Sequence, residues 1–249
     1  IENVRVICTA TDLPVNADFE GGYAHDPEGV AESVTMCVST GVAGLSIEDA
    51  TGDKDRPLYP FEQALARIKA ARAAIDETGE DVMLTARTEG FIRGRPDMDE
   101  TVKRLKAFAE AGADCLYAPG IKTKDEIRAV VGAVAPKPVN VLIGWPSIMS
   151  VQDVAALGVR RISVGGSLAR AAWGGFMRAA RQIAANGPIE IALSRGEHQS
   201  GHDQAHRPAG HGVGERLARG VDQVLNRNQV LNLRRPGRGH RKRDAAKRD

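Results

Sequence analysis

The chain has 249 residues, 42% of them hydrophobic, and a formal net charge of +2. That length suits one (β/α)₈ barrel of roughly 250 residues, or two smaller domains. No run of residues reaches the roughly 18 apolar side chains that a membrane span needs, so we expect no membrane partner. The cysteines Cys8, Cys37 and Cys115 are widely spaced and odd in number. This pattern excludes a disulfide framework and favours the reducing cytoplasm.

The small net charge conceals two different compositions. Residues 188–249 hold 13 Lys and Arg against 7 Asp and Glu, a net charge of +6, whereas residues 1–187 carry −4. The second stretch has no aromatic residue and is rich in His, Arg and Gly, which is typical of disorder. We therefore divide the chain into a first domain, residues 1–187, and a basic tail, residues 188–249.

In chain order, helical and strand-like patterns alternate through the first domain. The opening stretch, Ile1–Asp12, has the character of a helix end. The 3.6-residue periodicity then predicts helices over Glu28–Thr40, Pro60–Thr78, Met98–Ala111, Lys124–Val134, Ser150–Leu157 and Leu168–Ala185. Short apolar runs between turn residues predict strands over Val15–Asp18, Gly44–Ile47, Val82–Ala86, Cys115–Tyr117, Val139–Ile143 and Ile162–Val164.

This alternation with short connections predicts parallel strands, as in a barrel or a doubly wound sheet. Polar residues follow four of the strands, and reactive groups of barrels sit at such strand ends. We therefore predict an α/β protein with a (β/α)₈ (TIM) barrel. Only six strands are recognisable, so we expect the first two βα units, roughly 60 residues at about 30 per unit, to lie upstream of Ile1.

The first candidate site follows the first strand. Asp18 and Glu20 are two residues apart, so their side chains face the same side of an extended chain and could hold a hard cation such as Mg²⁺, partly through water. Gly21 and Gly22 would let backbone approach a ligand closely. The alternative is an N-cap acid followed by a turn.

Three further candidates follow later strands. Glu48 and Asp49 lead into a charged loop that could close over a substrate, with Lys54 delivering a cation or a proton; the alternative is a solvated surface loop. Arg87 could clamp a carboxylate or phosphate, held in place by Glu89, or form a structural ion pair. The amide of Asn140 could bind a substrate carboxylate or belong to a turn.

Five segments resemble one family in order and spacing: "NADFEGGY", "GVAGLSIEDATGD", "LTARTEGF", "AEAGADCLYAPG" and "LGVRRISVGGSLARAAWGG". Residues 1–187 are similar to the isocitrate lyase/phosphoenolpyruvate mutase superfamily, in particular to members described as carboxyvinyl-carboxyphosphonate phosphorylmutase or methylisocitrate lyase-like. The resemblance implies a Mg²⁺-dependent enzyme that makes or breaks C–C or P–C bonds through a pyruvate-like enolate.

The resemblance also implies individual roles. The metal ligands would be Asp18, Glu20 and Glu48; Lys54 falls where the mutases carry the lysine of a gating loop. Arg87 matches the substrate-gripping arginine, with Asn140 as a further contact to the substrate carboxylate. The chain departs from the lyases in the segment "ATGDKDRPLYP", which lacks their cysteine and histidine. It departs from both branches at Ala118-Pro119-Gly120, where the lyases have a glutamate and the mutases a histidine.

We therefore expect a lyase or phosphonomutase that acts on a small 2-oxo or phosphono carboxylate, as a homo-oligomer such as the tetramers of this superfamily. An alternative is a non-catalytic, truncated fragment of such an enzyme. A third possibility is nucleic-acid binding through the basic tail; seven acids and no aromatic residues among residues 188–249 argue against it.

Overall fold

The computed structural model of the protein describes residues 1–144, 147 and 149–185. The predicted basic tail, residues 188–249, lies outside the described residues. Its disorder and its role as a nucleic-acid arm therefore stay predictions.

Six parallel strands form one sheet, and each strand pairs with the next along the chain. The strands are β1 (Asn16–Asp18), β2 (Gly44–Glu48), β3 (Met83–Arg87), β4 (Cys115–Tyr117), β5 (Val139–Leu142) and β6 (Arg161–Ser163). A doubly wound sheet reverses its strand order at a switch point, whereas a barrel does not. The unbroken order therefore confirms the barrel class, and the described residues supply six of the eight strands that close such a barrel.

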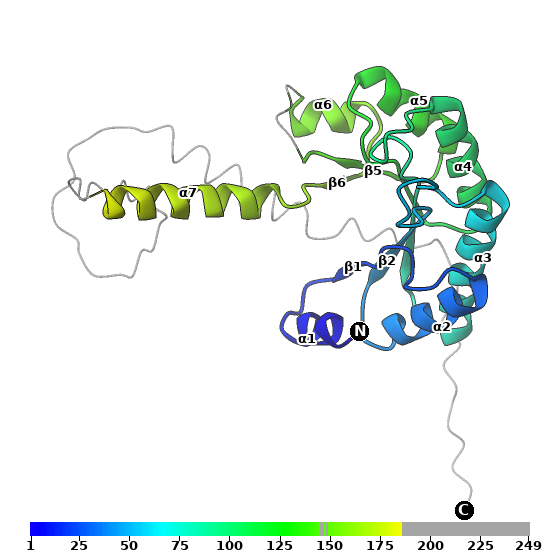
Figure 1. Ribbon diagram of the computed structural model, residues 1–249. Helices are drawn as coiled ribbons and strands as arrows, with labels where there is room; N and C mark the ends of the chain where they lie inside the picture. Colours follow the sequence, from blue (N-terminus) through cyan, green and yellow to red (C-terminus); the bar gives the residue numbers. More distant parts are fainter. Residues whose placement is uncertain (145–146, 148, 186–249) are drawn as a thin grey trace, which may run out of the picture. The chain divides into compact units, whose positions relative to one another are not determined.

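Helices alternate with these strands. They are α1 (Glu2–Thr9), α2 (Pro27–Val38), α3 (Phe61–Thr78), α4 (Met98–Glu110), α5 (Lys124–Val134), α6 (Val151–Ala156) and α7 (Ser167–Ala184). Figure 1 shows α2 to α5 along one face of the sheet. The predicted helix from Pro60 starts one residue later, because Pro60 is the N-cap of α3. Among the described residues, no helix combines the length and apolar character that crossing a bilayer requires.

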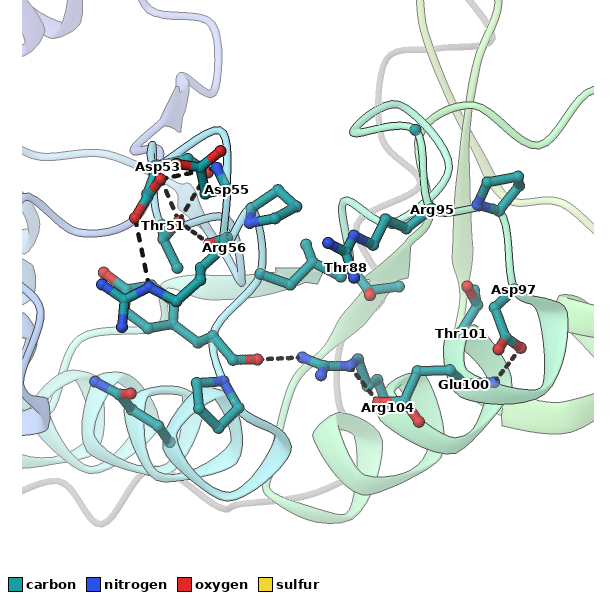
Figure 2. Close-up of a pocket in the computed structure, with 18 of the residues that line it drawn as sticks. Thr51, Asp53, Asp55, Arg56, Thr88, Arg95, Asp97, Glu100, Thr101 and Arg104 are labelled. Atoms are coloured by element: carbon teal, nitrogen blue, oxygen red, sulfur yellow. Dashed lines mark hydrogen bonds and ion pairs between the residues drawn. The ribbon is translucent and has the colours of Figure 1, made fainter.

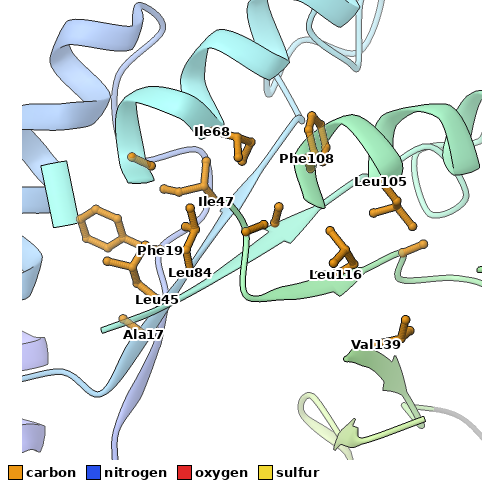
Figure 3. Close-up of a cluster of buried hydrophobic side chains, with 14 of the residues drawn as sticks. Ala17, Phe19, Leu45, Ile47, Ile68, Leu84, Leu105, Phe108, Leu116 and Val139 are labelled. Carbon is orange, nitrogen blue, oxygen red and sulfur yellow. The ribbon is translucent and has the colours of Figure 1, made fainter. Parts of the chain in front are cut away.

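The hydrophobic core lies between the sheet and these helices. Leu45, Ile47, Leu84 and Leu116 are completely buried, and Figure 3 shows them with Phe108 of α4. Since side chains alternate across a strand, the residues between them face the other side of the sheet. The helix-covered face is thus apolar, and the opposite face is left to polar side chains.

Side-chain caps fix where the helices begin after the strand-end loops. Asp26 accepts a hydrogen bond from the backbone N–H of Gly29 (2.7 Å) at the start of α2, and Asp97 accepts one from Glu100 (3.0 Å) at the start of α4. Thr123 and Glu126 form a capping box at the start of α5. These caps set the ends of the loops that carry the candidate site.

Candidate active site

A row of polar side chains crosses the sheet, from the last residues of β2, β3 and β4 to the second residue of β5. Glu48 of β2 is in register with Arg87 of β3, Arg87 with Tyr117 of β4, and Tyr117 with Asn140 of β5. Because side chains alternate between the two faces of a strand, these four residues lie on the face opposite the hydrophobic core. The structure therefore brings together three of the predicted site residues, Glu48, Arg87 and Asn140, along one line.

Arg87 lies at the centre of a cluster of carboxylates. It donates two hydrogen bonds to Oε1 of Glu89 (Nε 3.1 Å, Nη2 2.8 Å) and one to Oδ1 of Asp18 (2.7 Å). A third carboxylate, that of Glu48, lies 3.3 Å from Nη2. The predicted partnership of Arg87 with Glu89 is confirmed, and Arg87 joins residues at the ends of three strands.

The cluster holds three carboxylates, of which Glu48 and Glu89 are buried and Asp18 is exposed. Burial, followed by the nearby charge of Glu89, raises the pKa of Glu48 to about 7. Burial also raises the pKa of Glu89, although Arg87 opposes the shift. Burial acts to lower the pKa of Arg87, but the carboxylates around it raise the value overall. Electrostatically, the site favours an additional positive charge.

Two further residues of the site, Arg93 and Tyr117, were not predicted from the sequence. The guanidinium of Arg93 lies 3.4 Å from Glu48 and 3.6 Å from Glu89, with 42% of its side chain exposed. The guanidinium of Arg87 lies over the ring of Tyr117, and the distance from Cζ of Arg87 to the ring centroid is 5.0 Å. The four-residue spacing from Glu89 to Arg93 and the strand-end position of Tyr117 were the available signals.

Asn140 is buried and has one free acceptor. Its Nδ2 donates to Oγ of Ser163 on β6 (2.9 Å), while its Oδ1 has no hydrogen-bond partner among the described residues. The carbonyl oxygen can accept from a ligand donor, and Nδ2 carries a second N–H besides the one donated to Ser163. Its predicted contact with a substrate carboxylate needs the amide N–H and stays a prediction.

Asp18 and Glu20, predicted as metal ligands, occupy different settings. The side chain of Asp18 is 72% exposed and accepts hydrogen bonds from Arg87 and from Ser46 (3.3 Å). Glu20 is exposed; together with Asp18 it contributes, after burial, to a raised pKa of Tyr23. No group of three acidic, His or Cys side chains within the described residues is arranged to hold a metal ion. Of the three predicted metal ligands, Asp18 and Glu48 are the two whose carboxylates contact the same guanidinium, that of Arg87.

Gly21 and Gly22 belong to a tight turn in which the N–H of Gly22 donates to the carbonyl of Phe19 (2.8 Å). Gly22 has a φ of +73°, and a Cβ there would lie 3.2 Å from Ile47. A Cβ on Gly21 would lie 3.2 Å from Arg67. Packing therefore accounts for both glycines; their predicted contact with substrate stays a prediction.

Lys54 lies on the exposed loop after β2. Its stem is closed by a bridge between Ala50 and Leu58 and by a hydrogen bond from Thr51 N to the carbonyl of Pro57 (3.0 Å). None of the ion pairs among the described residues includes Lys54. The structure thus confirms a charged, compact loop but does not bring Lys54 to the cluster.

A cavity of about 1250 Å³ opens between this loop and the segment after β3. Figure 2 shows Asp53 and Arg56 on one wall, Arg95 and Asp97 on the other, and Arg104 between them. The cavity shares Thr88 with the strand end that carries Arg87, but the carboxylate cluster itself does not line it. We therefore take the carboxylate cluster around Arg87, where charged side chains are buried together, as the candidate active site.

These features define the fold class: a β/α barrel with polar side chains gathered at the carboxyl ends of its parallel strands, where barrel enzymes carry their reactive groups. The model of the family "Phosphoenolpyruvate phosphomutase" matches residues 1–184, and the chain belongs to this family. The resemblance drawn from the five sequence segments is thereby confirmed.

Solved structures and curated relatives agree with this assignment. A candidate lyase/mutase from Burkholderia cenocepacia J2315 is 44% identical, with a TM-score of 0.74 over 78% of this chain and 69% of that one. A 2,3-dimethylmalate lyase, a member of the PEP mutase/isocitrate lyase superfamily, is 25% identical, with a TM-score of 0.67 over 91% and 75%. An oxaloacetate decarboxylase from Chromohalobacter salexigens is 30% identical over 64% of this chain and 55% of its own length. The chain spans about half the length of the curated relatives it matches.

Proposed function

We propose that this chain carries the active site of a Mg²⁺-dependent lyase or phosphonomutase acting on a small 2-oxo or phosphono carboxylate. The observation that carries the proposal is the setting of Arg87, a largely buried guanidinium held by Asp18, Glu48 and Glu89 at the strand ends. A guanidinium fixed in this way is suited to grip a carboxylate or phosphonate. The relatives named as lyases and a decarboxylase act on acids of that size.

The charge of the cluster supports the metal. Two carboxylates, with water in the remaining positions, are a common ligand set for Mg²⁺, and Asp18 and Glu48 are the pair that would supply them. Burial and the nearby charge of Glu89 raise the pKa of Glu48, and Oε2 of Glu89 makes an ion pair with Arg93 (3.6 Å) but no hydrogen bond among the described residues, so a further cation would stabilise both carboxylates. When bound, the ion would stabilise the negative charge of an enolate oxygen.

The other residues orient the substrate. Arg87 would grip its carboxylate or phosphonate, and Tyr117 would keep the guanidinium in place from below. Arg93, partly exposed beside Glu48, adds a second cation at the entrance. Lys54 would approach through movement of the loop between Ala50 and Leu58.

The proposal is tested by following pyruvate release from oxaloacetate and from 2,3-dimethylmalate, and by ³¹P NMR of a phosphonopyruvate reaction. Each assay is run with and without Mg²⁺ beside a protein-free reaction. We expect turnover that requires Mg²⁺ and is lost in Asp18→Ala. The matched control is Asp125→Ala, which removes an exposed carboxylate from α5. Unchanged turnover in Asp18→Ala would refute the metal assignment, and no turnover by the wild-type chain would favour the non-catalytic fragment.

We also propose a cytoplasmic homo-oligomer. The free thiols of Cys8, Cys37 and Cys115 suit a reducing compartment. Exposed aromatic side chains on α7, Trp173 and Phe176, offer an apolar surface for association. Sedimentation of the purified chain tests the oligomer.

A further inference from the structure

The buried carboxylate of Asp49 binds the segment that follows Arg87. It directly follows Glu48, and 2% of the residue is exposed. Its Oδ1 accepts a hydrogen bond from the backbone N–H of Glu89 (2.8 Å), and its Oδ2 accepts one from Oγ1 of Thr88 (2.8 Å). Asp49 therefore fixes the two residues that follow Arg87.

Arg104 of α4 is the counter-ion of Asp49. Its Nη1 donates to Oδ2 of Asp49 (3.0 Å) and to the backbone carbonyl of Tyr59 (3.0 Å), and its Nε donates to Glu100 (2.8 Å). Figure 2 shows the guanidinium reaching from α4 across the floor of the cavity. The N–H of Tyr59 donates in turn to the carbonyl of Asp49 (2.9 Å). The pair thus joins the stem of the 50–58 loop to the ends of β2 and β3.

We propose that Asp49 and Arg104 are positioning residues for the substrate-binding arginine. By holding the backbone at Glu89, they set where the carboxylate of Glu89 meets Arg87, and by holding Tyr59 they fix the loop that carries Lys54 on the same anchor. The inference rests on the proposed function, because it takes Arg87 as the group that grips substrate.

A second buried pair provides a matched control. Arg72 of α3 donates to Oδ2 of Asp114 (2.9 Å), and the same oxygen accepts the backbone N–H of Leu84 (3.0 Å). Strand β3 therefore has an Arg–Asp anchor near each end, at Leu84 and at Glu89. The chemistry of the two anchors is the same, but only the Glu89 anchor adjoins Arg87. Loss of either pair should lower the stability of the fold. Only loss of the Asp49–Arg104 pair should also weaken ligand binding at Arg87.

The experiment compares Arg104→Met with Arg72→Met in the full chain. Affinity for oxalate, a small dicarboxylate probe, is measured by calorimetry in saturating Mg²⁺, together with the thermal midpoint of each variant. We expect Arg104→Met to weaken oxalate binding by about tenfold or more, since small misplacements of a binding group are costly. Arg72→Met, with a comparable loss of thermal midpoint, should stay within about twofold of wild type.

Two gentler variants keep the test decisive if Arg104→Met fails to fold. Arg104→Lys retains the charge but not the planar fork, and should bind oxalate with intermediate affinity. Thr88→Val removes one donor to Asp49 and should weaken oxalate binding by about threefold, which corresponds to the lower end of the net free energy of a single hydrogen bond. Hydrogen exchange without ligand should rise in peptides covering residues 50–60 and 87–93 for Arg104→Lys, and not for Arg72→Met.

The outcomes separate the two proposals. If wild-type chain does not bind oxalate, or Asp18→Ala binds it as well as wild type, the proposed function fails and this inference with it. If Asp18→Ala loses binding while the Arg104 and Thr88 variants bind like Arg72→Met, the site stands and the positioning role is overturned. Faster exchange confined to α4 in Arg104→Lys would also overturn it.

Discussion

Replacing Arg87 by methionine is the sharpest test of the charge arrangement at the strand ends. Met keeps much of the side-chain volume but removes the cation shared by Glu89, Glu48 and Asp18. Two of these carboxylates are buried, with 1% and 10% of the side chains of Glu89 and Glu48 exposed. The substitution therefore leaves buried negative charge without its main counter-ion.

The size of the effect follows from the neighbours that remain. Removing one partner of a buried ion pair costs about 3 to 5 kcal/mol. Asp18 is 72% exposed and regains water, so it adds little to this cost. Arg93 remains 3.4 Å from Glu48 and 3.6 Å from Glu89, which compensates in part. We therefore expect the lower end, a loss of about 3 kcal/mol, or a fall in thermal midpoint of about 6 to 12 °C for a domain of this size.

The assay is urea unfolding followed by circular dichroism, with Arg128→Met as the control. Arg128 pairs with Asp125 on the surface of α5, with 58% and 93% of the side chains exposed. Its loss should change stability by less than about 0.5 kcal/mol. A loss below about 1 kcal/mol for Arg87→Met, or one no larger than the control, would refute the reasoning that Glu89 and Glu48 depend on Arg87.

Three further predictions concern the framework. Phe108→Ala empties a completely buried position between α4 and the sheet, and should cost about 3 to 5 kcal/mol in the same unfolding assay; a loss under about 1 kcal/mol would contradict the packing. Thr123→Ala removes the cap of α5 and should cost about 1 kcal/mol, whereas Thr123→Ser should be close to neutral; equal losses would rule out the capping box. Burial raises the pKa of Cys37 to about 11, so at pH 8 its thiol should stay protonated and resist alkylation while partly exposed Cys8 reacts; mass spectrometry of the labelled chain that finds Cys37 modified first would disprove this.

Local sequence signals were sufficient for the framework. The predicted bounds of β4 and α5, Cys115–Tyr117 and Lys124–Val134, match the structure, because glycine, proline and capping residues mark the ends of these short elements. The polar residues at the strand ends were also predictable, since parallel strands bring their carboxyl ends to one edge. Glu48, Arg87 and Asn140 were therefore found from the sequence.

Contacts that depend on the path of a loop were not predictable. Arg93 reaches Glu48 because the segment after β3 turns back, with the N–H of Arg93 donating to the carbonyl of Glu89 (3.0 Å) and that of Arg95 to Gly90 (2.8 Å). The four-residue spacing from Glu89 to Arg93 is compatible with this turn, but it does not predict that Arg93 also reaches Glu48 on the neighbouring strand. The same holds for Lys54, whose position depends on how the loop between Ala50 and Leu58 lies. Periodicity predicts which face a residue of a regular element occupies, but not where a loop carries a side chain.

The charge of the cluster connects the proposed metal with the proposed substrate. When Asp18, Glu48 and Glu89 are all ionised, as they are above the pKa of about 7 of Glu48, they face the two guanidiniums of Arg87 and Arg93 and the charges sum to −1. A site with that charge repels a carboxylate substrate. One divalent cation would change the sum to +1 and release part of the hold of Glu48 and Asp18 on Arg87, which could then grip the substrate. On this reasoning oxalate should bind weakly without Mg²⁺ and tightly with it, and equal affinity in both conditions would show that Arg87 is available without the ion.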